Sequence, residues 1–133
     1  MIEIIEHKKS GSGFDTMHTY DAWKVVFITY AEQYCEFKDA KLVKRHTETD
    51  ETFVLIKGNA TLYTRDFEEP FLKTELEQEK LYCVKKNTWH HLSVSKDALL
   101  VVVENSNTII ANTERKSLAE TDKVILSACQ DNK

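Results

Sequence analysis

The sequence predicts an all-β domain, on three observations. Runs of β-branched and aromatic residues recur along most of the 133-residue chain at the roughly 8–12-residue spacing that is typical of short strands in a sandwich or barrel. Only the end of the chain has a pattern that favours a helix. With 41% hydrophobic residues, a chain of this length can bury one core without disulfides or a structural metal. We therefore predict a single domain over residues 1–133, with a core at about 20–106, an N-terminal arm at 1–19 and a C-terminal tail at 107–133.

The charged residues argue against nucleic acids and membranes as partners. The 18 Lys and Arg residues are outnumbered by 22 Asp and Glu residues, which gives a net charge of −4, and no basic run alternates with aromatic residues. Acidic residues interrupt the apolar N-terminus, and no later stretch approaches the roughly 20 apolar residues of a membrane span. The cysteines, at positions 35, 83 and 129, are widely spaced, which is typical of reduced thiols. These features predict a cytoplasmic protein.

The first expected elements are separated by a polar loop. Ile2–Ile5 is a β-prone piece that we expect to lie along a sheet edge, and residues 8–13 contain two glycines and two serines, which indicate a loop. Residues 23–30 are β-branched and aromatic almost throughout, so they predict the first long strand.

A buried strand is predicted at residues 53–56. Gly58 and Asn59 follow it and predict a turn that accepts positive φ, with residues 60–64 as the hairpin partner of the strand. Three further strands are expected at 81–84, 90–94 and 98–103. In the segment 117–130, a serine followed three residues later by a glutamate resembles a capping box, which predicts a short C-terminal helix; an extended arm is the alternative.

The faces of the strand at 53–56 indicate an oligomer. Because side chains alternate along a strand, Phe53 and Leu55 share the inward face with Glu51. Val54 and Ile56 then point outward and still need burial. We expect a homodimer, in which the sheets of two copies pack together, to cover them.

Two histidines and a glutamate at strand ends have the chemistry of metal ligands. His46 precedes Glu51 by five residues, and imidazole and carboxylate groups suit a divalent ion. A third ligand must come from another strand, where two histidines are adjacent. His90 shares the face of Leu92 and is expected to point inward, whereas His91 points outward, where it is exposed or covered by another element or subunit.

The stretch KRHTETDETFVLIKG (44–58) resembles the first motif of the cupin superfamily. In that motif, two histidines one residue apart precede a glutamate, which is followed after six residues by a glycine. Glu51 and Gly58 keep this separation, and His46 matches the second histidine. Lys44 stands at the position of the first histidine.

The stretch VKKNTWH (84–90) resembles the second cupin motif, in which proline, glycine and histidine recur at fixed spacing. His90 matches the histidine, whereas Lys85 stands at the proline and Asn87 at the glycine. Val94 stands at the position of the asparagine that follows. The resemblance spans about residues 20–106 and is to the small, single-domain, RmlC-like members of the superfamily.

The resemblance implies a jelly-roll barrel of two antiparallel sheets with a ligand cavity at one end. It also implies that His46, Glu51 and His90 bind a divalent metal, with Fe, Ni, Zn and Mn as candidates. The alternative is a hydrogen-bonded polar cluster, in which Lys44 pairs with Glu51 and takes the place of the metal. No organic cofactor is expected.

Two classes of function remain open from the sequence. The first is a metal-dependent enzyme, such as a dioxygenase, isomerase or lyase, acting on a small polar molecule. Its substrate would contact Lys44 and the apolar residues expected to line the cavity, which are Tyr30, Phe53, Leu55 and Leu92. The second is a sensor or binding module for small molecules that has lost its metal and does no catalysis. A metal-free isomerase is a third option.

Overall fold

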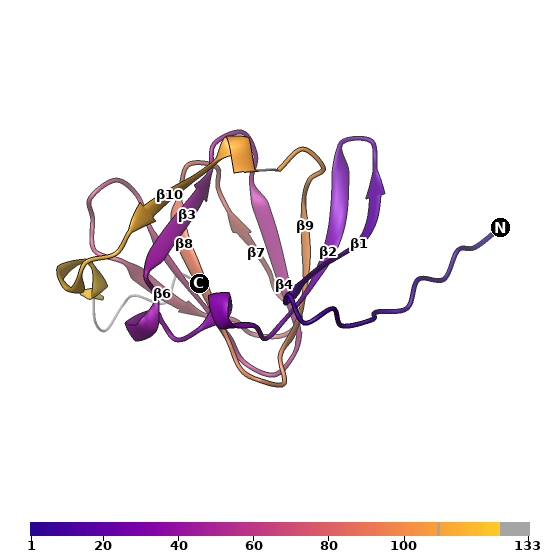
Figure 1. The fold of residues 1–133 in the computed structure, drawn as a ribbon, viewed down its shortest axis with the longest axis horizontal. Helices are drawn as coiled ribbons and strands as arrows, with labels where there is room; N and C mark the ends of the chain where they lie inside the picture. The colour runs from indigo at the N-terminus through magenta and orange to yellow at the C-terminus, as the bar shows by residue number, and fades with distance from the viewer. Residues whose placement is uncertain (109, 126–133) are drawn as a thin grey trace.

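The computed structural model describes residues 1–108 and 110–125, which form two antiparallel five-stranded sheets (Figure 1). We call them sheet A and sheet B. The strands of sheet A, in spatial order, are β1 (Phe14–Tyr20), β2 (Trp23–Thr29), β9 (Leu99–Asn105), β4 (Glu51–Lys57) and β7 (Leu81–Val84). Those of sheet B are β10 (Thr113–Ser117), β3 (Leu42–His46), β8 (Trp89–Val94), β5 (Ala60–Arg65) and β6 (Leu72–Glu75). The predicted all-β class is confirmed.

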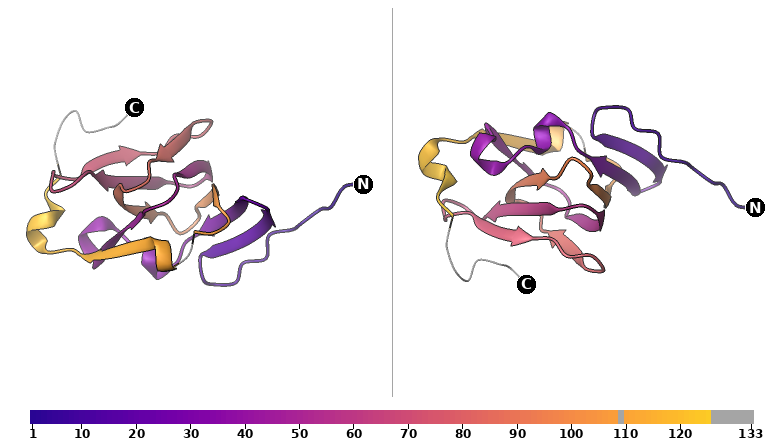
Figure 2. Two further views of the ribbon diagram at one scale, coloured as in Figure 1. Left: turned by 90° about the horizontal axis from the view of Figure 1, so that it is seen from above. Right: turned by 90° about the horizontal axis from the view of Figure 1, so that it is seen from below.

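Only short 3-10 helices interrupt the strands in the described part of the chain. They are η1 (Glu32–Tyr34), η2 (Phe37–Asp39), η3 (Ile110–Asn112) and η4 (Glu120–Lys123). No helix among the described residues is long and apolar enough to cross a membrane. The two views of Figure 2 show the sheets from above and below, with η4 at the end of the molecule opposite the N-terminal arm.

The main core lies between the sheets. Each strand contributes its inward residues, and the alternation predicted for β4 is confirmed, since Phe53 and Leu55 are buried while Ile56 is exposed. Val26, Leu100 and Val102 from sheet A are fully buried opposite the apolar residues of sheet B. This packing is the main apolar contact that holds the sheets together.

A second core covers the outer face of sheet B. Phe37 and Ala40, from the segment that contains η1 and η2, pack with Trp89, Val43 and Phe71. This segment therefore covers the outward side of β8. The outer apolar residues of sheet B are buried by the chain itself, without a second subunit.

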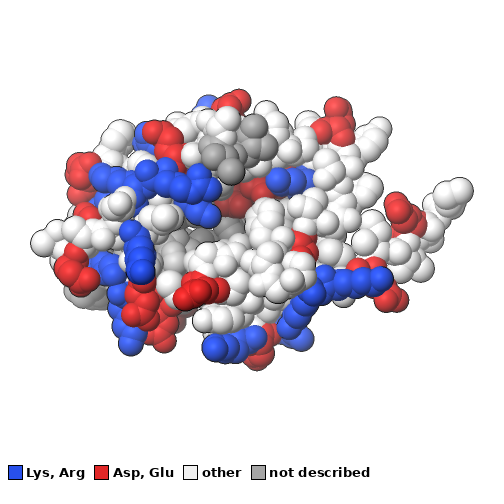
Figure 3. All heavy atoms as spheres, viewed as in Figure 1, with Lys and Arg blue, Asp and Glu red and all other residues white. Residues whose placement is uncertain are grey.

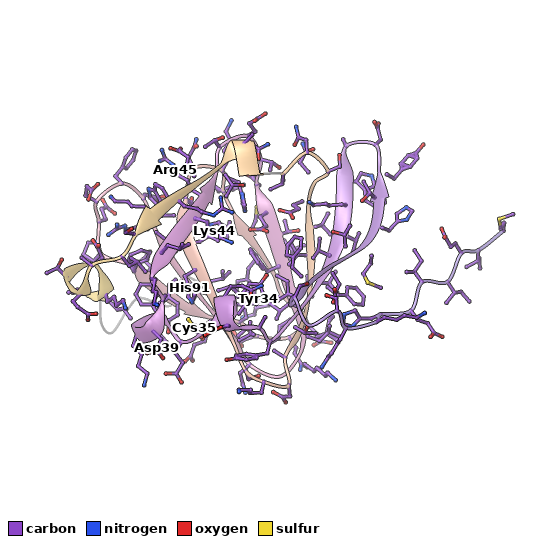
Figure 4. All side chains as sticks on the ribbon, in the orientation of Figure 1. Tyr34, Cys35, Asp39, Lys44, Arg45 and His91 are labelled. Carbon is purple, nitrogen blue, oxygen red and sulfur yellow. The ribbon has the colours of Figure 1, made fainter. Side chains whose placement is uncertain are left out.

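His91 lies on that covered face, opposite in direction to His90, as the alternation predicts. It is buried, with Phe37 and Tyr63 beside its ring. Its Nε2–H donates a hydrogen bond to the carbonyl of Cys35 at 2.7 Å, and Figure 4 shows the two residues next to each other. Burial lowers the pKa of His91. Of the two expectations for this residue, cover by another element of the same chain is the one that the structure shows.

The predicted hairpin at Gly58 and Asn59 is wrong. The strands on either side of it belong to different sheets, since β4 pairs with β7 and β9 while β5 pairs with β6 and β8. The turn therefore carries the chain from sheet A to sheet B. Gly58 has a φ of +78°, and a Cβ at this position would lie 2.6 Å from Cα of Ala98, so the corner needs a glycine.

The two sheets extend beyond the expected core at both ends. β1 brings residues 14–19 into sheet A, and β10 brings residues 113–117 into sheet B. Ile2–Ile5 forms no strand and does not lie along a sheet edge, because this first part of the chain projects away from the sheets (Figure 1).

The C-terminal helix expected from residue 117 is represented by η4 alone. Ser117 is the last residue of β10, and the carboxylate of Asp122 accepts the Ala119 N–H at 2.8 Å, so the predicted capping box is wrong. Residues 126–130 of the expected helix lie outside the described residues.

Candidate metal centre and ligand cleft

The site is built from two rows of side chains that face each other across the sandwich. In sheet B, Lys44 on β3 is paired directly with His90 on β8 and with Arg115 on β10. Directly paired residues project from the same face of a sheet, so the three form one row. His46 lies two residues along β3 from Lys44 and therefore on the same face.

The facing row in sheet A is acidic at its centre. Glu51 on β4 is paired with Glu104 on β9, which is paired with Lys24 on β2. The Lys24 ammonium lies 3.7 Å from Oε1 of Glu104 and donates a hydrogen bond to the Thr108 carbonyl at 3.3 Å. Both carboxylates stand at inward positions of their strands and are buried.

Three side chains meet between these rows. Oε1 of Glu51 lies 3.2 Å from Nε2 of His46 and 3.3 Å from Nε2 of His90. One candidate ligand atom from each of the three residues lies within 4.8 Å of the others. Glu51 and His90 are buried and His46 is partly buried. The structure thus brings together the three residues that the sequence predicts as a metal set.

The remaining ring nitrogens of the two histidines are fixed by other groups. Nδ1 of His90 lies 3.0 Å from the Thr88 carbonyl, and Nδ1 of His46 lies 3.0 Å from the Thr113 hydroxyl. A carbonyl oxygen only accepts, so the Nδ1 of His90 must carry a proton. In neutral His90, Nε2 then presents a lone pair, as a metal ligand requires.

This donor set fits a cation. A bare Nε2 of His90 and a carboxylate oxygen of Glu51 both present lone pairs, and these repel each other at 3.3 Å. A cation, either a proton on the imidazole or a metal ion between the groups, removes that repulsion. Two imidazoles and one carboxylate are suitable ligands for Fe(II) and Zn, and Ni and Mn accept the same atoms.

The two carboxyl groups have opposite pKa shifts. Burial acts to raise the pKa of Glu51, but hydrogen bonds and positive charge from His46 and His90 outweigh burial and lower it below its ordinary value. Burial and the negative charge of Glu51 raise the pKa of Glu104 to about 8. Burial and the same charge raise the pKa of Tyr34, which comes from η1 at the cleft wall.

Lys44, on β3, lies beside the three candidate ligands and forms no ion pair with Glu51 among the described residues. In this part of the chain, the nitrogens nearest to the Glu51 carboxylate are those of His46 and His90. Figure 4 shows Lys44 on β3 at the space between the two sheets. Burial and the neighbouring Arg115 charge lower the pKa of Lys44.

The three residues open into a cleft of about 960 Å³. Of the residues predicted to contact a ligand, Lys44, Phe53 and Leu92 line this cleft together with the candidate metal ligands. Tyr30 and Leu55 do not line it, because Leu55 is buried in the main core and Tyr30 packs against the edge of that core under Lys96. A second hollow, between β5, β6 and β7, contains no histidine among its described lining residues.

Several residues of the cleft were missed by the sequence analysis. Glu104 and Lys24 could have been predicted, because each stands at an inward position of a strongly apolar strand. Thr113 and Arg115 could not have been predicted, because they lie in the segment that the sequence assigns to a tail. Their place in the cleft depends on the pairing of β10 with β3, which no local pattern predicts.

The comparisons with known proteins were informative at the level of structure alone. Neither the known family profiles nor the curated proteins give a match. A cupin-2 domain containing protein from Shewanella frigidimarina superposes with a TM-score of 0.54 at 14% identity, covering 74% of this chain and 84% of that one. The fold is a cupin fold.

Two further structures agree with the cupin fold. The QdtA 3,4-ketoisomerase from Thermoanaerobacterium thermosaccharolyticum, as a double mutant in complex with TDP, has a TM-score of 0.57 at 14% identity, over 71% of this chain and 67% of that one. KdgF from a Halomonas species has a TM-score of 0.52 at 10% identity, over 77% and 87%. At these identities the cupin likeness concerns the fold and not the reaction.

Proposed function

We propose that this cupin-fold protein binds a small polar molecule in the cleft and is a metal-dependent enzyme, with the metal held by His46, Glu51 and His90. The observation that carries the proposal is the approach of two imidazole Nε2 atoms to one carboxylate oxygen. Fe, Ni, Zn and Mn are the candidate ions. The reaction classes that such a site can serve include those of dioxygenases, isomerases and lyases.

A divalent ion bound by these residues would polarise a carbonyl or hydroxyl oxygen of a molecule in the cleft. The protein's own groups prepare that place. The Thr88 carbonyl and the Thr113 hydroxyl orient the two imidazole rings, so that both Nε2 atoms point toward Glu51. Phe53 and Leu92 give the cleft apolar walls, which exclude water from the ligand.

The second candidate function is a binding module without metal or catalysis. It is favoured by Lys44, which stands where the cupin motif has its first histidine and which brings a positive charge to the same row as His90. In this case His90 would be protonated and would form an ion pair with Glu51.

Metal content separates the two candidates. The protein is purified, reconstituted with Fe(II), Ni, Zn or Mn, and assayed by elemental analysis beside His90→Ala and a control, His18→Ala, whose side chain is exposed on β1. The first function requires about one metal ion per chain in the wild type and in the control, and a loss in His90→Ala. A wild type that contains no metal after reconstitution would exclude the metal-dependent enzyme and favour the binding module.

We also propose that the protein is a homodimer that associates through the outer face of sheet A. The paired residues Phe27, Val101, Val54 and Leu81 form an apolar outward row across four strands, which ends at Asp15 on β1, the direct neighbour of Phe27. The neighbouring row contains Val25 and Val103, and Val103 and Leu81 are exposed. A contiguous apolar face of this kind is typical of a surface that is covered by association.

A further inference from the structure

Among the described residues, four cations line the cleft and none belongs to the metal set: Lys24, Lys41, Lys44 and Arg115. Lys44 and Arg115 are direct cross-strand neighbours on β3 and β10, and both line the cleft. Lys44 is in turn the direct neighbour of His90, so the row runs from His90 through Lys44 to Arg115. Neighbouring strands are about 5 Å apart, which places the two cations next to the candidate metal centre on the same wall.

Neither Lys44 nor Arg115 has an ion-pair partner among the described residues. The nearby cations on the same two strands have partners, since Arg45 contacts Glu114 at 2.8 Å and Lys116 contacts Glu68 at 3.2 Å.

The described acidic residues of the cleft contact other groups or form no ion pair with Lys44 and Arg115. Glu51 contacts the two histidines, and Glu104 contacts Lys24. Glu32 and Asp39, from η1 and η2, line the cleft but form no ion pair with Lys44 or Arg115 in the described part of the chain. The positive charge of the pair is therefore open to a ligand.

Like charges side by side in a partly buried cleft repel each other, and this repulsion is strongest where water is excluded. Lys44 is partly buried, whereas Arg115 is exposed at the mouth. An anion placed between them reverses the sign of the interaction and accepts charge-assisted hydrogen bonds from both. In Figure 3, Lys and Arg atoms gather over β3 and β10, with Asp and Glu atoms next to them in the middle of this face.

We propose that Lys44 and Arg115 form an oxyanion subsite, which binds a carboxylate or phosphate group of the substrate and directs the rest of the molecule toward His90. The direction toward His90 rests on the proposed function, whereas the binding of an anion by the two cations does not require a metal. Because Lys44 lies on the strand next to that of His90, and Arg115 lies one strand further, the substrate needs only a few bonds between its oxyanion and the oxygen that faces the metal set. Small 2-oxo or 2-hydroxy acids and small phosphate esters have this form.

The test compares charged and neutral probes by NMR titration, which measures weak binding. Pyruvate, pyruvamide and inorganic phosphate are titrated into the protein with and without Co(II), whose absorption reports on the metal set independently. The variants are Lys44→Gln and Arg115→Gln. The control is Lys116→Gln, which removes the same charge from the residue next to Arg115 on the opposite face of β10. Circular dichroism establishes that each variant is folded.

The subsite predicts that wild type and control bind pyruvate or phosphate about tenfold or more tightly than pyruvamide, with or without Co(II), and that both cleft variants lose this preference. Tighter binding of phosphate than of pyruvate would indicate a phosphate ester; the reverse order would indicate an acid. Equal binding of pyruvate and pyruvamide by the wild type, or a preference unchanged in Arg115→Gln, would overturn the proposal. If the wild type prefers the anions but gives no Co(II) spectrum, the metal proposal is overturned and the oxyanion subsite is supported.

Discussion

The Nε2 atom of His90 lies 3.3 Å from Oε1 of Glu51, and this contact joins sheet B to sheet A at the cleft. The two residues lie 39 positions apart in the chain (90 − 51) and reach each other only because the sandwich closes. The Nδ1–H of His90 donates a hydrogen bond to the Thr88 carbonyl, so in the neutral ring Nε2 presents its lone pair toward a cation. A cation bound by Glu51 and His90 would therefore connect the two sheets and stabilise the sandwich.

Metal addition should stabilise the wild type and not Glu51→Gln. A ligand that binds only the folded state raises the free energy of unfolding, by about 2.7 kcal/mol at a concentration of 100 Kd. Replacing the carboxylate by an amide removes the anionic ligand to which both imidazoles point. The measurement is urea unfolding with and without ZnCl₂. Glu48→Gln, an exposed neighbour, is the control and should respond to zinc as the wild type does. Equal stabilisation of Glu51→Gln would exclude this carboxylate as a ligand.

The sequence predicted this site better than it predicted the cleft around it. The proximity of His46, Glu51 and His90 could be predicted because the ligand types are few and because strand alternation decides between His90 and His91. Leu55 and Tyr30 were misplaced, since alternation separates inside from outside but does not say how far along the barrel the cleft extends.

Pairing between distant strands was the part that the sequence could not supply. The turn at Gly58 has the residues of a hairpin, yet the chain changes sheets there. A glycine suits both cases, because it accepts positive φ in a tight turn and because its lack of a Cβ permits the close approach to Ala98. Arg115 and Thr113 reach the cleft through the register of β10 against β3. Register depends on the packing of the whole sandwich, and a single sequence does not show it.

Gly58→Ala should destabilise the protein much more than Gly11→Ala. Both glycines have positive φ, which costs an alanine about 1 kcal/mol. At Gly58 the added methyl also meets Ala98 and the Ser95 side chain at less than 3.0 Å, whereas at Gly11 nothing lies within 4 Å. We expect losses of about 2–4 kcal/mol for Gly58→Ala and about 1 kcal/mol for Gly11→Ala, measured by urea unfolding. Similar losses for the two would mean that the corner relaxes around the methyl group.

Asp122→Asn should lower stability at neutral pH, with a smaller effect in acid. Oδ2 of Asp122 accepts the Ala119 N–H at 2.8 Å, and Oδ1 lies 3.2 Å from Nη1 of the buried Arg65. These contacts lower the pKa of Asp122 below its ordinary value of 3.8. A lowered carboxyl pKa stabilises the fold above the unfolded-state pKa, and the contribution is lost as the pH falls through and below that value.

The expected loss for Asp122→Asn is about 1–3 kcal/mol at pH 7, because Arg65 is left buried beside an uncharged amide. The free energy of unfolding is measured at pH 7 and at a pH below 3.8, where the difference from the wild type should shrink. Glu120→Gln, in the same 3-10 helix but with an exposed side chain, is the control and should change little at either pH. A loss independent of pH would assign the effect to packing instead of charge.

Val103→Lys should separate the proposed dimer into monomers. Val103 is exposed on the outer face of sheet A, where its direct neighbours are Val25 and Thr52, so a lysine there places a charge in the middle of the apolar face. Burying that ammonium against a second copy without a partner would cost more than the contact gains. Sedimentation velocity at micromolar concentration should give a dimer for the wild type and a monomer for the variant. Val124→Lys, at an exposed valine outside the sheets, should remain dimeric. A monomeric wild type would show that the outer face of sheet A does not associate with a second copy.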